Sequence, residues 1–274
     1  MLVSLGFSPC PNDTFIFDAL VNNLIDTQGM KFTVRLEDVQ TLNELALNNT
    51  LDFSKISYGV LPRILNNYKV LNSGSALGSG VGPLLISKKI FSATDLKETV
   101  VAIPGENTTA HLLFKLAFPE VKKKIFLRYD EIENFVLAKN YENRAGVIIH
   151  ENRFTYQDKG LKKIIDLGEF WEHEMGVPIP LGGIVAKTSI DIEVVKTVDQ
   201  LIKESILFAF KRYPILSEYI SSNSQEMSET VMRNHIDLYV NQYSIELGEQ
   251  GRTAIEKLLS VYNHDLPLHT LFIS

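Results

Sequence analysis

Cysteine is nearly absent from this chain, because Cys10 is the only one among 274 residues. A single thiol has no partner within the chain, so a fold held together by disulfide bonds is excluded. Basic residues are also in the minority, with 27 Lys and Arg against 33 Asp and Glu and a formal net charge of −6. The chain therefore lacks the basic surface that nucleic-acid phosphates require, and we expect no nucleic-acid partner.

Long apolar runs and metal-binding motifs are missing as well. No stretch approaches the ~20 apolar residues that span a bilayer, and the N-terminus has no basic n-region, so we expect no membrane partner and a cytoplasmic location. The chain has no His-Glu-x-x-His motif, no Cys-x-x-Cys pair and no calcium loop, so we expect no metal. Gly78, Gly80 and Gly82 imitate a phosphate loop, but Pro83 and an apolar run follow where a helix is required. We therefore expect no dinucleotide cofactor.

The chain does contain segments rich in Val, Ile and Phe that alternate with helical patterns. This alternation is typical of β-α-β units and predicts an α/β protein with a largely parallel sheet. Strands are expected at residues 2–7, 31–36, 53–56, 100–103, 125–128, 145–149 and 182–186. Helices are expected near residues 13–24, 61–66, 109–118, 132–139, 194–213, 228–243 and 246–262, and after a capping box formed by Thr41 and Glu44.

The glycine-rich segment 68–87 interrupts this pattern, and we interpret it as a crossover into a second lobe. The first lobe is then discontinuous and comprises residues 1–86 plus 184–274, and the second comprises residues 87–183. Two chain crossings make a hinge, and a cleft between two lobes is a common ligand site.

His150 stands out among the histidines because it directly follows the apolar strand expected at 145–149. Open α/β sheets bind ligands outside the carboxyl ends of their strands. An imidazole at that position is able to take a proton at neutral pH. A histidine that is merely tied down by hydrogen bonds at a strand end is an equally good interpretation of the residue alone.

Small polar side chains also mark three strand-to-helix junctions, namely Asn12 with Asp13, Ser57, and Thr108 with Thr109. A helix N-terminus flanked by hydroxyls binds anions, although helix capping by itself explains the threonines. The convergence of all three junctions on one cleft favours a ligand site. Cys10 lies near the first of these helix starts, where a thiolate is stabilised, but a buried cysteine is more often a small apolar residue.

Several blocks of sequence are more specific than these patterns. In chain order they are residues 7–15 (FSPCPNDTF), 36–39, 41–43, 55–58 (KISY), 78–84 (GSGVGPL), 108–110, 146–156 (GVIIHENRFTY), 178–182 and 239–241. Together they resemble the 1,4-dihydroxy-6-naphthoate synthases of the futalosine route to menaquinone. The resemblance implies a two-lobed periplasmic-binding-protein-like fold of type II with a ligand cleft between the lobes. It further implies a lyase that converts cyclic dehypoxanthinyl futalosine to 1,4-dihydroxy-6-naphthoate and releases dihydroxyacetone.

The resemblance also implies roles for particular residues. His150 takes the place of the family's proton-accepting histidine, and the substrate-binding segments match Lys55, Ile56 and Ser57, and Thr109 with Ala110. The substrate would be a small anion, which a chain of net charge −6 must capture locally through helix N-termini, hydroxyls and Lys55. The chemistry needs neither a metal nor an organic cofactor. The sequence leaves a homodimer open.

The main alternative is a solute-binding protein or ligand sensor that uses the same cleft and catalyses nothing. A secretory signal or a lipidation cysteine would favour that function, and the sequence shows neither.

Overall fold

The computed structural model describes residues 1–139, 143–224, 228–262 and 271–273. The chain forms two compact units, the first comprising Met1–Gly78 with Pro180–Ser274 and the second comprising Ser79–Ile179. We expected the crossings after residues 86 and 183, and both fall earlier. The first is earlier because residues 84–87 form a strand that pairs with two strands of the second unit. The second is earlier because the strand at 179–187 pairs with the first unit's strand at 53–57 from Gly182 onward.

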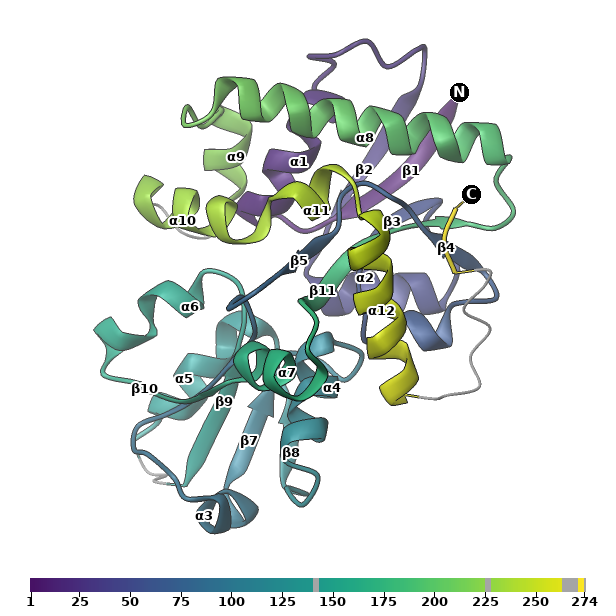
Figure 1. Cartoon of the computed structure of the whole chain (residues 1–274). Helices are drawn as coiled ribbons and strands as arrows, with labels where there is room; N and C mark the ends of the chain where they lie inside the picture. Colours follow the sequence, from purple (N-terminus) through teal and green to yellow (C-terminus); the bar gives the residue numbers. More distant parts are fainter. Residues whose placement is uncertain (140–142, 225–227, 263–270, 274) are drawn as a thin grey trace. The chain divides into compact units, whose positions relative to one another are not determined.

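The first unit is built on a six-stranded mixed sheet (Figure 1). Five of its strands lie in the order β2 (Lys31–Leu36), β1 (Leu2–Phe7), β3 (Phe53–Ser57), β11 (Ile179–Lys187) and β4 (Tyr68–Val70), and β5 (Ala76–Gly78) also pairs with β11. Strand β1 is parallel to β2 and β3, whereas β11 is antiparallel to β3 and β4. The expected strands at 2–7 and 31–36 are confirmed to the residue.

The helices of the first unit follow the expected pattern only in part, because the helix at 218–223 was not expected and the one expected at 228–243 is divided into two. The helices are α1 (Pro11–Val21), α2 (Val39–Leu47), α8 (Ile192–Arg212), α9 (Glu218–Asn223), α10 (Glu229–Tyr239), α11 (Gln242–Ile245) and α12 (Gly248–Tyr262), with a short 3-10 turn at Leu61–Arg63 in place of the helix expected at 61–66. The prediction of a capping box formed by Thr41 and Glu44 was wrong, since Asp38 caps α2 by accepting from the backbone N–H groups of Gln40 and Thr41. An aspartate at this position offers a charged acceptor to the helix N-terminus, which a threonine lacks.

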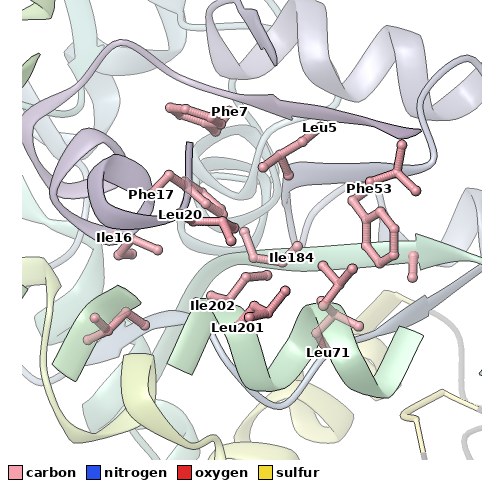
Figure 2. Packing of buried hydrophobic residues seen from close by; sticks show 14 of the residues in the cluster. Leu5, Phe7, Ile16, Phe17, Leu20, Phe53, Leu71, Ile184, Leu201 and Ile202 are labelled. Carbon is pink, nitrogen blue, oxygen red and sulfur yellow. The ribbon is translucent and has the colours of Figure 1, made fainter. Parts of the chain in front are cut away.

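The core of the first unit forms where α1 and α8 pack together against the sheet. Strand residues such as Leu5 and Phe53 meet Phe17 of α1 and Ile202 of α8 in one buried apolar cluster (Figure 2). Helix α1 also contacts α9 and α10, and its residues from Pro11 to Leu20 are all buried. The turn that precedes α1 is therefore held by a helix packed on several sides.

The second unit has a five-stranded sheet of its own. Its strands lie in the order β10 (Lys162–Asp166), β6 (Leu84–Ser87), β9 (Arg144–Ile148), β7 (Val100–Ile103) and β8 (Lys124–Phe126). Strand β7 is parallel to both β8 and β9. The helices are α3 (Ala93–Glu98), α4 (Thr109–Ala117), α5 (Ile132–Leu137), α6 (Asn152–Thr155) and α7 (Leu167–Met175), and 3-10 turns lie at Tyr129–Glu131 and Tyr156–Lys159. Strands β6 and β10 and helices α3, α6 and α7 were not expected from the sequence.

Among the described residues, no helix combines the length and the apolar character that a membrane crossing demands.

Candidate functional site

Two polar turns of the first unit lie at one edge of its sheet. Asn12 and Asp13 follow β1, and Ser57 ends β3, which is the parallel neighbour of β1. The carboxyl ends of parallel neighbours point the same way, so this part of the expected arrangement is explained by strand order. Cys10 is buried at the N-cap position of α1.

Asp13 and Lys55 form a buried ion pair in these turns. The distance from Lys55 Nζ to Asp13 Oδ1 is 3.1 Å, and the two side chains are only 7% and 3% exposed. The same ammonium donates to the carbonyl oxygen of Gly74 at 2.8 Å. The positive charge that we expected for capturing an anion is thus already neutralised, and two protein acceptors engage an ammonium that carries three hydrogens.

The Asp13 carboxylate accepts from several donors around the start of α1. One oxygen accepts from the Ser8 backbone N–H at 3.2 Å and from the Ser8 hydroxyl at 2.7 Å. The other accepts from Asn12 Nδ2 at 2.9 Å as well as from Lys55. Four donors surround one carboxylate, which fixes Asp13 as a structural centre of the turn.

The Asn12 amide carries an acceptor with no partner. Its oxygen Oδ1 is buried and meets no hydrogen-bond donor among the residues that the structure describes. The orientation of the amide is set by Asp13, because an amide oxygen turned toward that carboxylate would be repelled. A buried acceptor left unsatisfied costs about 1–3 kcal/mol, so this atom is suited to a ligand that brings a donor.

Ser57 and its neighbours are held by close backbone packing. The Ser57 backbone N–H donates to Asn43 Oδ1 at 2.9 Å, and the Tyr58 hydroxyl lies 2.7 Å from that of Ser75. Burial raises the pKa of Tyr58 well above its ordinary value, so the phenol stays neutral. A Cβ atom on Gly183 would lie 2.1 Å from that hydroxyl oxygen, which explains the glycine in β11.

Of the expected substrate-binding residues in this unit, Ile56 has a fully buried side chain in the core. A ligand would meet it through its backbone.

In the second unit, β7 and β9 are parallel neighbours, so the segments that follow them lie at the same sheet edge. Thr108 caps α4, since its hydroxyl accepts from the His111 backbone N–H at 3.2 Å and donates to the Gly105 carbonyl at 2.9 Å. Thr109 and Ala110 are the first two residues of the helix, and both are buried. Capping therefore accounts for Thr108, whereas Thr109 stands at the helix N-terminus, where backbone N–H groups favour an anion.

His111 lies in the first turn of the same helix. Burial lowers its pKa below the ordinary value, which opposes the protonated form. Its Nδ1 lies 2.7 Å from the Glu106 carbonyl oxygen, and the imidazole adds no full positive charge at neutral pH. Anion binding at this helix start would depend on the peptide dipoles and hydroxyls.

His150 follows β9 in a left-handed backbone conformation, with φ of 57°. Non-glycine residues rarely adopt this region, and such strain clusters at functional sites. The ring is half-buried and packs edge-on against Tyr129, with centroids 5.0 Å apart. The position at the carboxyl end of a strand agrees with the sequence expectation, but the backbone strain was not foreseen.

Sequence reasoning assigned no site role to two residues that follow His150 closely in the chain, Glu151 and Arg153. The Glu151 carboxylate is buried, and neither of its oxygens has a hydrogen-bond partner within the described part of the chain. Arg153 makes an ion pair with Asp166. Both Glu151 and Arg153 belong to the block 146–156 used above, so the signal was present in the sequence, but the partners of Arg153 come from distant segments.

The arrangement of two sheets on a chain that crosses twice has close counterparts among solved structures. A protein from Archaeoglobus fulgidus superposes with a TM-score of 0.89 at 29% identity, covering 96% of this chain and 97% of that one. The periplasmic aliphatic sulphonate binding protein SsuA from Escherichia coli matches with a TM-score of 0.68 at 8% identity, covering 100% and 92%. The chain therefore has the periplasmic-binding-protein fold, as the sequence predicted.

Sequence comparison narrows this class. The family model for menaquinone biosynthesis matches residues 3–264. A 1,4-dihydroxy-6-naphthoate synthase from Thermus thermophilus is 40% identical over 256 residues, covering 93% of this chain and 92% of that protein. The corresponding enzyme from Streptomyces coelicolor is 38% identical over 263 residues, covering 94% and 92%. The chain belongs to this menaquinone-biosynthesis family, and the resemblance stated from the motifs is confirmed.

Proposed function

We propose that this protein is a carbon–carbon lyase of the futalosine route, converting cyclic dehypoxanthinyl futalosine to 1,4-dihydroxy-6-naphthoate with release of dihydroxyacetone. The observation that carries the proposal is the family match over residues 3–264, together with two relatives of that activity that align over more than nine-tenths of the chain. The fold by itself decides nothing about catalysis, since one fold hosts binding proteins and enzymes alike.

His150 is the residue proposed as general base. It would take a proton from a carbon beside a carbonyl of the substrate, and the electron pair left behind would start ring opening and end in an aromatic product. A general base contributes ~10² to 10⁴-fold, and oriented donors that stabilise the developing oxyanion supply much of the remainder. Its support is the place of His150 after β9 and its left-handed backbone, which projects this residue from a strained turn.

The substrate carboxylate is assigned to the N-terminus of α4. Thr109 and Ala110 form its first turn, where backbone N–H groups point outward from the helix start. Lys55 is a weaker candidate than the sequence implied, because Asp13 cancels its charge and Gly74 takes a second donor. Lys55, Ile56 and Ser57 would therefore contribute hydrogen bonds and shape, with Thr108 acting through its cap.

Each unit contains a buried acceptor that is suited to a hydroxyl donor. Asn12 Oδ1 and the Glu151 carboxylate are buried acceptors without donors among the described residues. The proposed substrate carries hydroxyls on its sugar-derived part, and a hydroxyl donates to an acceptor of this kind. Asp13 would act indirectly, by holding the Asn12 amide in its orientation.

The deciding experiment incubates the purified protein with cyclic dehypoxanthinyl futalosine and follows naphthoate formation by absorbance and mass spectrometry. We expect product in the presence of EDTA, with dihydroxyacetone released in equal amount. A substrate-dependent rise in Tm without product would instead assign the protein to the non-catalytic solute binders. A cytoplasmic location, independence from cofactors and a homodimer remain expectations.

A further inference from the structure

The left-handed backbone conformation of His150 requires a structural restraint. A left-handed non-glycine residue costs about 1–3 kcal/mol, and such a conformation persists only where neighbouring contacts determine it. Helix α6, which begins two residues later, has only four residues and cannot supply this rigidity alone. The restraint must come from side chains that tie the segment to the rest of the unit.

Arg153 makes most of those ties, beside a hydrogen bond from Asn152 Nδ2 to the Glu133 carboxylate at 2.5 Å. Its backbone N–H donates to the His150 carbonyl oxygen at 3.2 Å, which closes the turn that contains the histidine. Its guanidinium donates to the Gly80 carbonyl at 2.7 Å, to the Gly82 carbonyl, and to the Asp166 carboxylate at 2.6 Å. One side chain thus joins the histidine turn to two other segments of the second unit.

The partners of Arg153 are themselves fixed. Asp166 is fully buried, and its other oxygen caps α7 by accepting from the Gly168 backbone N–H at 2.8 Å. A Cβ atom on Gly82 would lie 2.0 Å from the Gly168 nitrogen, so the two backbones are in direct contact. The Gly80 backbone N–H donates to Glu172 of α7 at 2.7 Å. The guanidinium is therefore anchored to a rigid platform and not to a free loop.

We infer that Arg153 is a positioning residue that holds His150 in its left-handed conformation and so sets the direction of its imidazole. This inference rests on the proposed role of His150 as general base. The planar fork of arginine reaches two carbonyls and a carboxylate at once, whereas the single ammonium of lysine cannot match that geometry. Displacement of a catalytic group by about 1 Å costs ~100-fold in rate, so the effect should appear in kcat.

The test compares Arg153→Lys and Arg153→Met with Lys159→Met as a matched control. Lys159 lies at the other end of the same segment, and its half-exposed ammonium pairs with Glu133 at 2.5 Å. Replacing it leaves the contacts of Arg153 and the hydrogen bond from Asn152 to Glu133 in place, so kcat is compared per folded molecule. We expect kcat to fall roughly 10-fold for Arg153→Lys and roughly 100-fold for Arg153→Met, with KM within about twofold of wild type. The pH profile of kcat should shift in both variants and stay unchanged in the control.

A second measurement does not depend on turnover. The His150 ring proton is identified in the NMR spectrum by its absence in His150→Ala, and its chemical shift and titration are followed in each variant. We expect both to change in Arg153→Lys and to stay as in wild type in Lys159→Met. The exposed ring of His173 serves as an internal reference.

The outcomes distinguish the positioning role of Arg153 from the general-base role of His150. If Arg153→Lys is folded, turns over like wild type and leaves the His150 resonance unmoved, the positioning role is overturned. A lowered Tm with unchanged kcat per folded molecule also overturns it, because Arg153 would then be merely structural. If His150→Ala keeps its kcat, the general-base role fails, while the NMR titration still decides whether Arg153 orients His150.

Discussion

The buried Asp13 and Lys55 pair offers a sharp test of the structure. The substitution Asp13→Asn removes the negative charge of the carboxylate. It also places an amide NH₂, which is a donor, beside groups that are themselves donors. Asp13 accepts three hydrogen bonds and pairs with one ammonium, so the new NH₂ faces either the Ser8 backbone N–H or the Asn12 amide and the Lys55 ammonium, none of which can accept from it. The Lys55 ammonium then remains buried without a counter-ion.

The expected loss in the free energy of unfolding follows from the burial of the two side chains. Removing one partner of a buried ion pair costs about 3–5 kcal/mol, because the remaining charge is left uncompensated. Solvent screening does not reduce this value, since the side chains are only 7% and 3% exposed. A protein is stable by roughly 5–15 kcal/mol in total, so Asp13→Asn should remove a large part of the free energy of unfolding.

The assay is urea unfolding followed by far-UV circular dichroism. The control is Glu229→Gln, which removes the exposed Arg233 pair, whose side chains are 38% and 64% exposed, and should cost less than ~1 kcal/mol. Adding Lys55→Met to Asp13→Asn should recover part of the loss, because the unpaired charge disappears. If Asp13→Asn unfolds at the same urea concentration as Glu229→Gln with an unchanged m-value, the reasoning about this buried pair is refuted.

Other expectations concern chemistry and pH. His150→Ala should fold and bind substrate but lose at least ~100-fold in kcat, and near-normal turnover would remove the base role. Thr109→Val should raise KM several-fold in steady-state kinetics, whereas unchanged constants would leave the threonine a structural role. Cys10→Ser should keep its kcat, so a folded but inactive variant would revive a thiol nucleophile. Burial raises the pKa of Asp199, so its contribution to stability is full below about pH 3.8 and is lost as the pH rises through the raised pKa. Asp199→Asn should therefore gain in Tm relative to wild type between pH 4 and pH 7, and parallel pH profiles would contradict this assignment.

Local patterns in the sequence predicted much of the fold. The alternation of apolar and polar residues set the bounds of β1 and β2 to the residue, and the strand before His150 was placed within one residue at each end. Such features depend on neighbours in the chain, which a sequence displays directly. The helix N-cap at Asp38 shows the margin of error, because it lies three positions before the predicted capping residue Thr41 and only the backbone path selects the residue that caps.

The sequence by itself determined the α/β class, the family and the position of His150 at a strand end. Tertiary structure decided that Lys55 pairs with Asp13, that the chain crosses after Gly78 and Ile179, and that Arg153 reaches Gly80, Gly82 and Asp166. The physical reason is that these contacts join residues far apart in the chain. Charge neutralisation and anchoring depend on which strands become neighbours, and strand order is a property of the packed sheet that no local pattern encodes.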